Sequence, residues 1–109
     1  MAVTTNISTF YRGEDAIINF TMTPTTDISG WTLTFTVAAD SNSVAPKLIT
    51  KTCAILVAAS GTFKATLLAA DSSGIEPGVY FWDVWRTDSG SARMLGNGAF
   101  TINGTARLP

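Results

Sequence analysis

The sequence predicts an all-β fold, a single antiparallel β-sandwich domain of about seven strands spanning residues 1–109. Apolar and polar residues alternate with a period of two in successive short segments, as expected of half-buried strands. Gly, Pro, Asn, Asp and Ser separate these segments at roughly the spacing typical of a sandwich. A chain of 109 residues also has single-domain length and can bury a core without a disulfide or a metal.

The clearest predicted strand spans residues 31–37. It places four apolar residues on one face and three threonines on the other: Trp31, Leu33, Phe35 and Val37 opposite Thr32, Thr34 and Thr36. Residues 15–22 alternate in the same way, with Ile18, Phe20 and Met22 on one face. Turn-forming residues dominate 23–30, between the two segments. We therefore expect two antiparallel strands that each turn one face to the core.

Further strands are expected over residues 47–57, 62–68, 79–86 and 93–102. The first of these is long enough to be bent or split. The second places Phe63, Ala65 and Leu67 on one face. At most one short helical turn is expected, near residues 70–76, where Asp71 can cap it and Pro77 ends it.

The strand at residues 79–86 carries large side chains on both faces. Tyr80, Trp82 and Val84 form one set, and Phe81, Asp83 and Trp85 form the other. An unpaired carboxylate is costly to bury in an apolar core, so we assign the Asp83 face to the outside. Two aromatic side chains on an outer face have three explanations: cover by a loop or terminus of the same chain, a protein–protein contact, or a small ligand.

The register of this strand against residues 93–102 is left open by the sequence. A two-residue loop at Ser89 and Gly90 would place Phe100 and Ile102 on the outer face with Phe81. A longer loop, or a bulge at residues 96–98, would return them to the core. We favour the bulge or the longer loop.

The composition argues against most catalytic chemistry. The chain has no histidine and a single cysteine, so it lacks an imidazole base, a Ser-His-Asp triad, a histidine metal ligand and an activating partner for Cys53. Glu14 and Asp15 are the only adjacent carboxylates, and neighbouring strand residues point to opposite faces. We expect no enzyme activity, no cofactor and no metal.

Charge and hydropathy limit the expected partners. The seven basic residues are scattered, without the cluster that nucleic acid or an anionic membrane would require. Neither a signal peptide nor an apolar segment of membrane-spanning length is apparent, so synthesis in a cytoplasm is expected. The formal net charge of -1 gives little mutual repulsion and favours association.

Several turn-and-strand motifs occur in a recognisable order. They are FYRGED at residues 10–15, DISGWTLTF at 27–35, PGVYFWDV at 77–84 and GAFTI at 98–102. Over nearly its full length the chain resembles the immunoglobulin-like N-terminal domain of phage baseplate upper proteins and related small phage and prophage structural proteins. The resemblance implies an immunoglobulin-like sandwich that serves as a virion assembly or attachment module, often multimeric. Family members commonly carry this domain before longer fibre or receptor-binding regions, and the absence of such a region after Pro109 favours a small connector, decoration or accessory protein.

We therefore expect a non-enzymatic phage or prophage virion structural protein, in the baseplate, tail or head, that forms homo-oligomers or docks onto another virion protein. Phe81 and Trp85 are the expected contact residues, and Asp83 and Arg93 are expected to form the polar contacts that align the partner. Pairing through a sparsely charged edge strand is a second possible mode. The alternative function is a carbohydrate-binding or adhesive module, in which the aromatic rings stack on sugars and Asp83 and Asn97 form hydrogen bonds.

Overall fold

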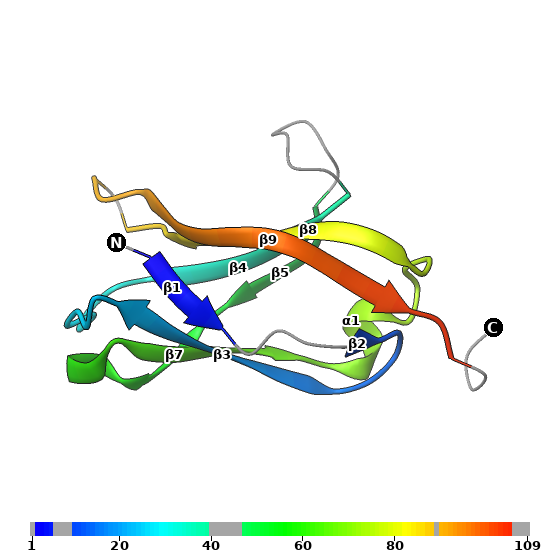
Figure 1. Cartoon of the computed structure of the whole chain (residues 1–109), viewed down its shortest axis with the longest axis horizontal. Helices are drawn as coiled ribbons and strands as arrows, with labels where there is room; N and C mark the ends of the chain where they lie inside the picture. Colours follow the sequence, from blue (N-terminus) through cyan, green and yellow to red (C-terminus); the bar gives the residue numbers. More distant parts are fainter. Residues whose placement is uncertain (1, 6–9, 40–46, 89, 106–109) are drawn as a thin grey trace.

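Two β-sheets pack face to face in the computed structural model, which describes residues 2–5, 10–39, 47–88 and 90–105 (Figure 1). The strands are β1 (Ala2–Thr5), β2 (Phe10–Tyr11), β3 (Ala16–Thr23), β4 (Leu33–Ala38), β5 (Lys47–Thr52), β6 (Ala54–Val57), β7 (Thr62–Leu67), β8 (Gly78–Arg86) and β9 (Arg93–Asn103). Two short helical turns join them, the 3-10 turn η1 (Ala58–Ser60) and α1 (Ala69–Ser72). No described helix is long and apolar enough to cross a membrane.

The strand order is that of an immunoglobulin sandwich. One sheet has the order β1-β3-β7-β6, and the other has the order β2-β9-β8-β4-β5. Within the described residues every pairing is antiparallel except that of β2 with β9. The first sheet corresponds to the A-B-E-D sheet of immunoglobulin domains, and the second contains the equivalents of strands G, F and C. The predicted fold, an all-β immunoglobulin-like sandwich, is confirmed.

Nine strands are described rather than about seven. One reason is that the long segment predicted at residues 47–57 splits at Cys53, with β5 in one sheet and β6 in the other. The Cys53 N–H donates to the carbonyl of Leu33 at 2.8 Å, so the chain leaves the five-stranded sheet directly after this bond and enters the four-stranded one. The other additions are β1 and β2, two short edge strands that the sequence pattern did not predict.

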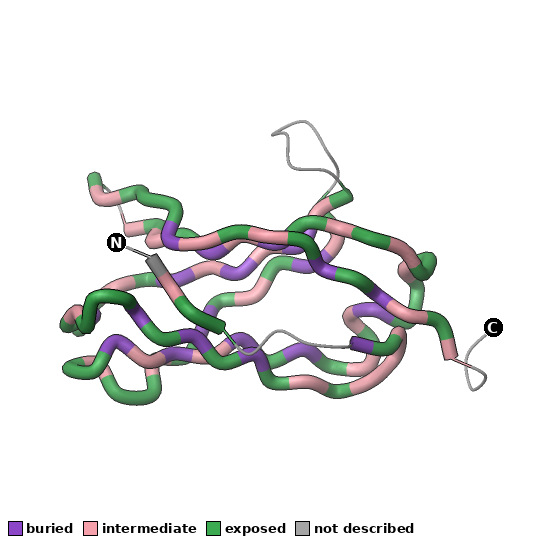
Figure 2. Tube along the Cα trace, viewed as in Figure 1, coloured by how far each residue is buried: buried purple, intermediate pink, exposed green. Residues whose placement is uncertain are grey.

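The core forms where the alternating faces of the two sheets meet. Figure 2 shows buried and exposed residues alternating along the strands. Nine of the ten apolar positions predicted on the inner faces of segments 15–22, 31–37 and 62–68 are buried: Ile18, Phe20, Met22, Leu33, Phe35, Val37, Phe63, Ala65 and Leu67. The tenth, Trp31, lies before the start of β4 and is half-buried against the core. Trp82 and Val84 of β8 join the nine buried residues, as does Phe100 of β9. Period-two patterning therefore determined which face of each strand is inside.

The predicted helical turn is α1, which begins slightly earlier than expected, and Asp71 stabilises its start from the third helical position rather than as the N-cap residue, which is Leu68. The Asp71 carboxylate accepts a hydrogen bond from the Leu68 N–H at 2.7 Å and lies 2.9 Å from Lys51 Nζ. A second turn, η1, was not predicted. It ends at Gly61, whose φ of 70° is in the left-handed region that glycine adopts without strain.

The β8–β9 hairpin contains a bulge, as favoured from the sequence, but one residue earlier than expected. Val84 pairs with Gly96 and Trp85 pairs with Met94, which leaves Leu95 as the extra residue. Leu95 is buried, and so are Phe100 and Ile102. The bulge lies at Leu95 because this residue can enter the core there, whereas Asn97 stays exposed on the outer face.

Candidate interaction surface

The outer face of the five-stranded sheet carries a group of exposed apolar side chains. We define the outer patch as Val79, Phe81, Trp85 and Met94, which are 62%, 37%, 38% and 42% exposed. The first three lie at alternate outward positions of β8, and Met94 lies directly opposite Trp85 on β9. β8 lies between β9 and β4, so a rigid part of the sheet holds the patch.

Small neighbours flank the Phe81 ring on both sides and the Trp85 ring on its β4 side. Phe81 pairs with Ala38 on β4 and with Ala99 on β9. Trp85 pairs with Thr34 on β4. Because cross-strand neighbours are the side chains that cover a residue on a sheet face, short ones leave the rings open to a partner.

Asp83 lies between Phe81 and Trp85 on the same outer face. Its cross-strand partners are Thr36 and Asn97. The Asp83 side chain forms no hydrogen bond or ion pair with any residue that the structure describes. The outer patch therefore surrounds a carboxylate whose hydrogen-bonding capacity is free for a partner.

No described segment encloses Phe81 and Trp85, because more than a third of each side chain is exposed. Of the three explanations considered for their outward position, complete cover by their own chain does not fit this structure. A protein contact and a small ligand are both compatible with it.

Arg93 is not part of this surface. It is the first residue of β9 and pairs with Arg86, on the side of the hairpin opposite Trp85 and Met94. There the two arginines line a cleft of about 410 Å³ together with Trp31 and Leu95. This cleft could not be predicted from the sequence pattern, because its lining depends on the hairpin register and on a contact between residues far apart in the chain.

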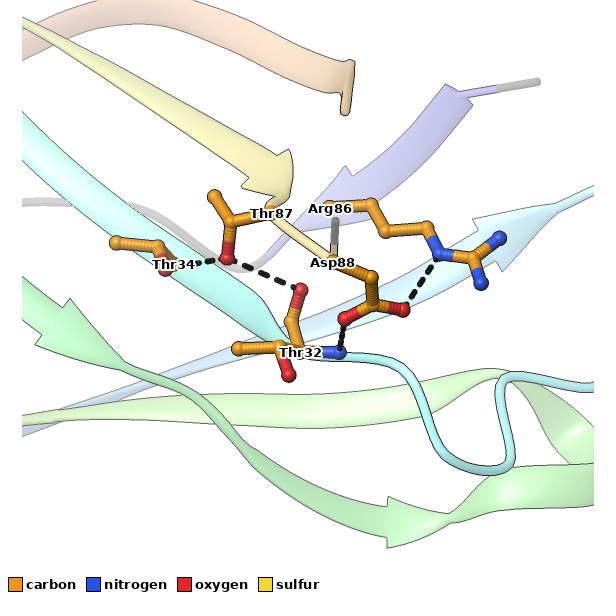
Figure 3. Close-up of polar contacts among 5 residues, drawn as sticks. All are labelled: Thr32, Thr34, Arg86, Thr87 and Asp88. Atoms are coloured by element: carbon orange, nitrogen blue, oxygen red, sulfur yellow. Dashed lines mark hydrogen bonds and ion pairs between the residues drawn. The ribbon is translucent and has the colours of Figure 1, made fainter. Parts of the chain in front are cut away.

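A set of polar contacts holds the Arg86 side of the cleft in place (Figure 3). The Arg86 guanidinium lies 4.1 Å from the centroid of the Trp31 ring, a cation–π contact. Arg86 Nε donates to Asp88 Oδ2 at 2.9 Å, and Asp88 Oδ1 accepts a hydrogen bond from the Thr32 N–H. The hydrogen bond from Arg86 lowers the pKa of Asp88. Partial desolvation opposes this shift, and the hydrogen bond from the Thr32 N–H adds to it.

The single cysteine, Cys53, does not provide a reactive nucleophile in the folded protein. Cys53 is buried where the chain crosses between the sheets. Burial raises the pKa of its thiol to about 12, although a hydrogen bond from the Phe35 backbone partly offsets the effect. The thiolate, which is the nucleophilic form, is therefore scarce at neutral pH.

No protein-family model matches the chain, and no curated protein is significantly similar to it in sequence.

Proposed function

We propose that this protein is a non-enzymatic structural component of a phage or prophage virion that works by self-association or by docking onto another virion protein through the outer patch. The observation that supports the interaction role is the exposure of Phe81 and Trp85 on a central strand. The virion setting rests on the resemblance of the turn-and-strand motifs to phage baseplate domains.

The chemistry of the outer patch suits a protein partner. Aromatic side chains bury a large area with little loss of conformational freedom, and they are enriched at the centres of interfaces. Trp85 and Met94 lie side by side, and a thioether adapts easily to the shape of a partner. Asp83 adds one charged acceptor within the apolar surface, which favours a partner that presents a donor there.

The sheet edges are less suited to association than this face. β5, one edge of the five-stranded sheet, carries Lys47 and Lys51. β6, an edge of the other sheet, has only four residues and is irregular between Ile55 and Val57. Charge, shortness and bulges all oppose strand addition, so the flat face is the preferred contact.

The test is the oligomeric state of the purified chain with Trp85→Ala or Phe81→Ala, measured by light scattering over a range of concentrations. Residues at an interface centre contribute about 2 kcal/mol or more, so the Trp85 variant should associate roughly thirtyfold more weakly. Ile17→Ala is the matched control, because Ile17 is a large exposed apolar residue on the outer face of the other sheet.

Circular dichroism and thermal unfolding would show whether each variant keeps its fold. If Trp85→Ala unfolds the monomer, Trp85 is a core residue and the proposal fails. If the wild-type chain stays monomeric at high concentration, self-association is excluded and docking onto another protein is the remaining mode of the proposal. Glycan binding that Phe81→Ala and Trp85→Ala abolish would support the carbohydrate-binding alternative instead.

A further inference from the structure

We propose that the cleft at the end of the β8–β9 hairpin binds a carboxylate of a peptide, the side chain of an aspartate or glutamate. The site consists of the guanidinium groups of Arg86 and Arg93 with Trp31 and Leu95 as an apolar wall. It lies on the other side of the hairpin from the outer patch and does not depend on the function proposed for that patch.

The cleft contains a pair of like charges that is only partly compensated. Arg86 and Arg93 are directly opposite each other in the antiparallel pairing of β8 and β9. Like charges at such positions destabilise a sheet. Asp88 neutralises only one of them, and Arg93 has no hydrogen bond or ion pair with any residue in the described part of the chain. The site therefore has a formal charge of about +1, which a single carboxylate would balance.

Arg86 is already held in position within the cleft. Trp31 supports the plane of its guanidinium, and Asp88 accepts the hydrogen bond from Nε. Figure 3 shows the two terminal nitrogens pointing away from Asp88, and no described residue accepts a hydrogen bond from them. A fixed guanidinium with free terminal nitrogens is suited to a carboxylate, which it binds through two parallel hydrogen bonds. Because the side chain is already ordered, binding costs little conformational entropy.

The shape of the cleft fits a side chain. Its volume of about 410 Å³ is within the range of small-ligand sites. Gly90, Ser91 and Ala92 also line the cleft, and because none of them has a large side chain they leave it open. Trp31 and Leu95 provide apolar surface for the methylene groups of an acidic side chain.

Asp88 favours a carboxylate over a phosphate. Its own negative charge lies next to Arg86, at 2.9 Å from Nε. The Asp88 carboxylate would repel a dianionic phosphate, whose two negative charges are also more than the single net positive charge of the site can balance. A monoanion matches the charge and can share the two arginines without displacing Asp88.

The experiment is an NMR titration of the full chain with N-acetyl-aspartyl-methylamide, which carries one carboxylate. The matched neutral probe is N-acetyl-asparaginyl-methylamide, and inorganic phosphate is the third probe. The signals to follow are the indole N–H of Trp31 and the Nε–H of Arg86. We expect a saturable shift of both signals with the aspartyl probe, no saturation with the asparaginyl probe, and a higher Tm in the presence of the aspartyl probe.

Arg93→Gln should weaken binding of the aspartyl probe at least tenfold and leave the fold intact, because it removes a repulsive charge. Lys64→Gln, which removes a positive charge from the other sheet, should leave the affinity unchanged. Equal binding of the two peptide probes, loss of affinity in both variants, or no saturable shift would overturn the proposal. Phosphate binding tighter than aspartyl binding would overturn it too, since the cleft would then be a general anion site.

Discussion

The Trp82 indole packs directly against Gly98 of the neighbouring strand. The two residues are cross-strand partners, and a Cβ atom at residue 98 would come within 2.9 Å of Trp82 Nε1. Trp82 in turn lies 5.9 Å from Phe20 and 6.1 Å from Phe35, measured between ring centroids. Antibody domains join the strands equivalent to β3 and β8 with a disulfide. Here an aromatic contact between Phe20 and Trp82 bridges the same pair of strands, and a glycine on β9 makes room for it.

Gly98→Ala should therefore lower the free energy of unfolding by about 1–3 kcal/mol, because the added methyl group overpacks the Trp82 ring. The measurement is urea denaturation followed by tryptophan fluorescence. Gly74→Ala is the control, since a Cβ atom at Gly74 meets nothing within 4 Å. If the Gly98 variant is as stable as the wild type, β8 and β9 can move apart to accommodate the methyl group without loss of stability, and the close contact between Trp82 and Gly98 is not required.

Tyr80 forms a tyrosine corner. It lies near the start of β8, two residues before Trp82, and its hydroxyl group donates a hydrogen bond to the backbone carbonyl of Glu76. Tyr80→Phe should reduce the free energy of unfolding by about 0.5–1.5 kcal/mol, the usual net contribution of one hydrogen bond. Tyr11→Phe, at an exposed site, should change it far less. A similar loss in both variants would argue against the corner.

Cys53 should resist alkylation in the folded protein. A thiol with a pKa of about 12 instead of 9.0 has about a thousandfold less thiolate at neutral pH, and Cys53 is also buried. Iodoacetamide labelling, followed by mass spectrometry, should be at least that much slower in buffer than in denaturing urea. Rapid labelling without urea would mean that the crossing between β5 and β6 opens readily.

Asp88 should contribute to the acid dependence of stability. Its pKa is lower in the folded protein than its ordinary value of 3.8, chiefly because of the bond from Arg86. The contribution is complete above the unfolded-state pKa and is lost as the pH falls towards the folded-state pKa. Asp88→Asn should therefore be less stable than the wild type near pH 7, and the difference should shrink in acid. Thermal unfolding at several pH values tests this, and a difference that grows on acidification would contradict it.

Much of the fold follows from residues near one another in the chain. The alternation in residues 15–22, 31–37 and 62–68 predicts which side chains are buried, because a strand turns every second residue to the same face. The same reasoning places Phe81 and Trp85 outside, since Asp83 shares their face and a lone carboxylate is costly to bury. The order of apolar and polar residues within each strand is enough for these assignments.

Other features depend on which strands meet. The bulge at Leu95 sets the pairing of β9, and only that pairing puts Arg93 opposite Arg86 and away from the outer patch. The contact between Trp31 and Arg86 joins residues far apart in the sequence. The sequence by itself determined the sandwich and the inner and outer faces of its central strands, through side-chain periodicity and the cost of burying charge. Tertiary structure alone decided the register, the crossing at Cys53 and the arginine-lined cleft, because each depends on long-range pairing that no local pattern encodes.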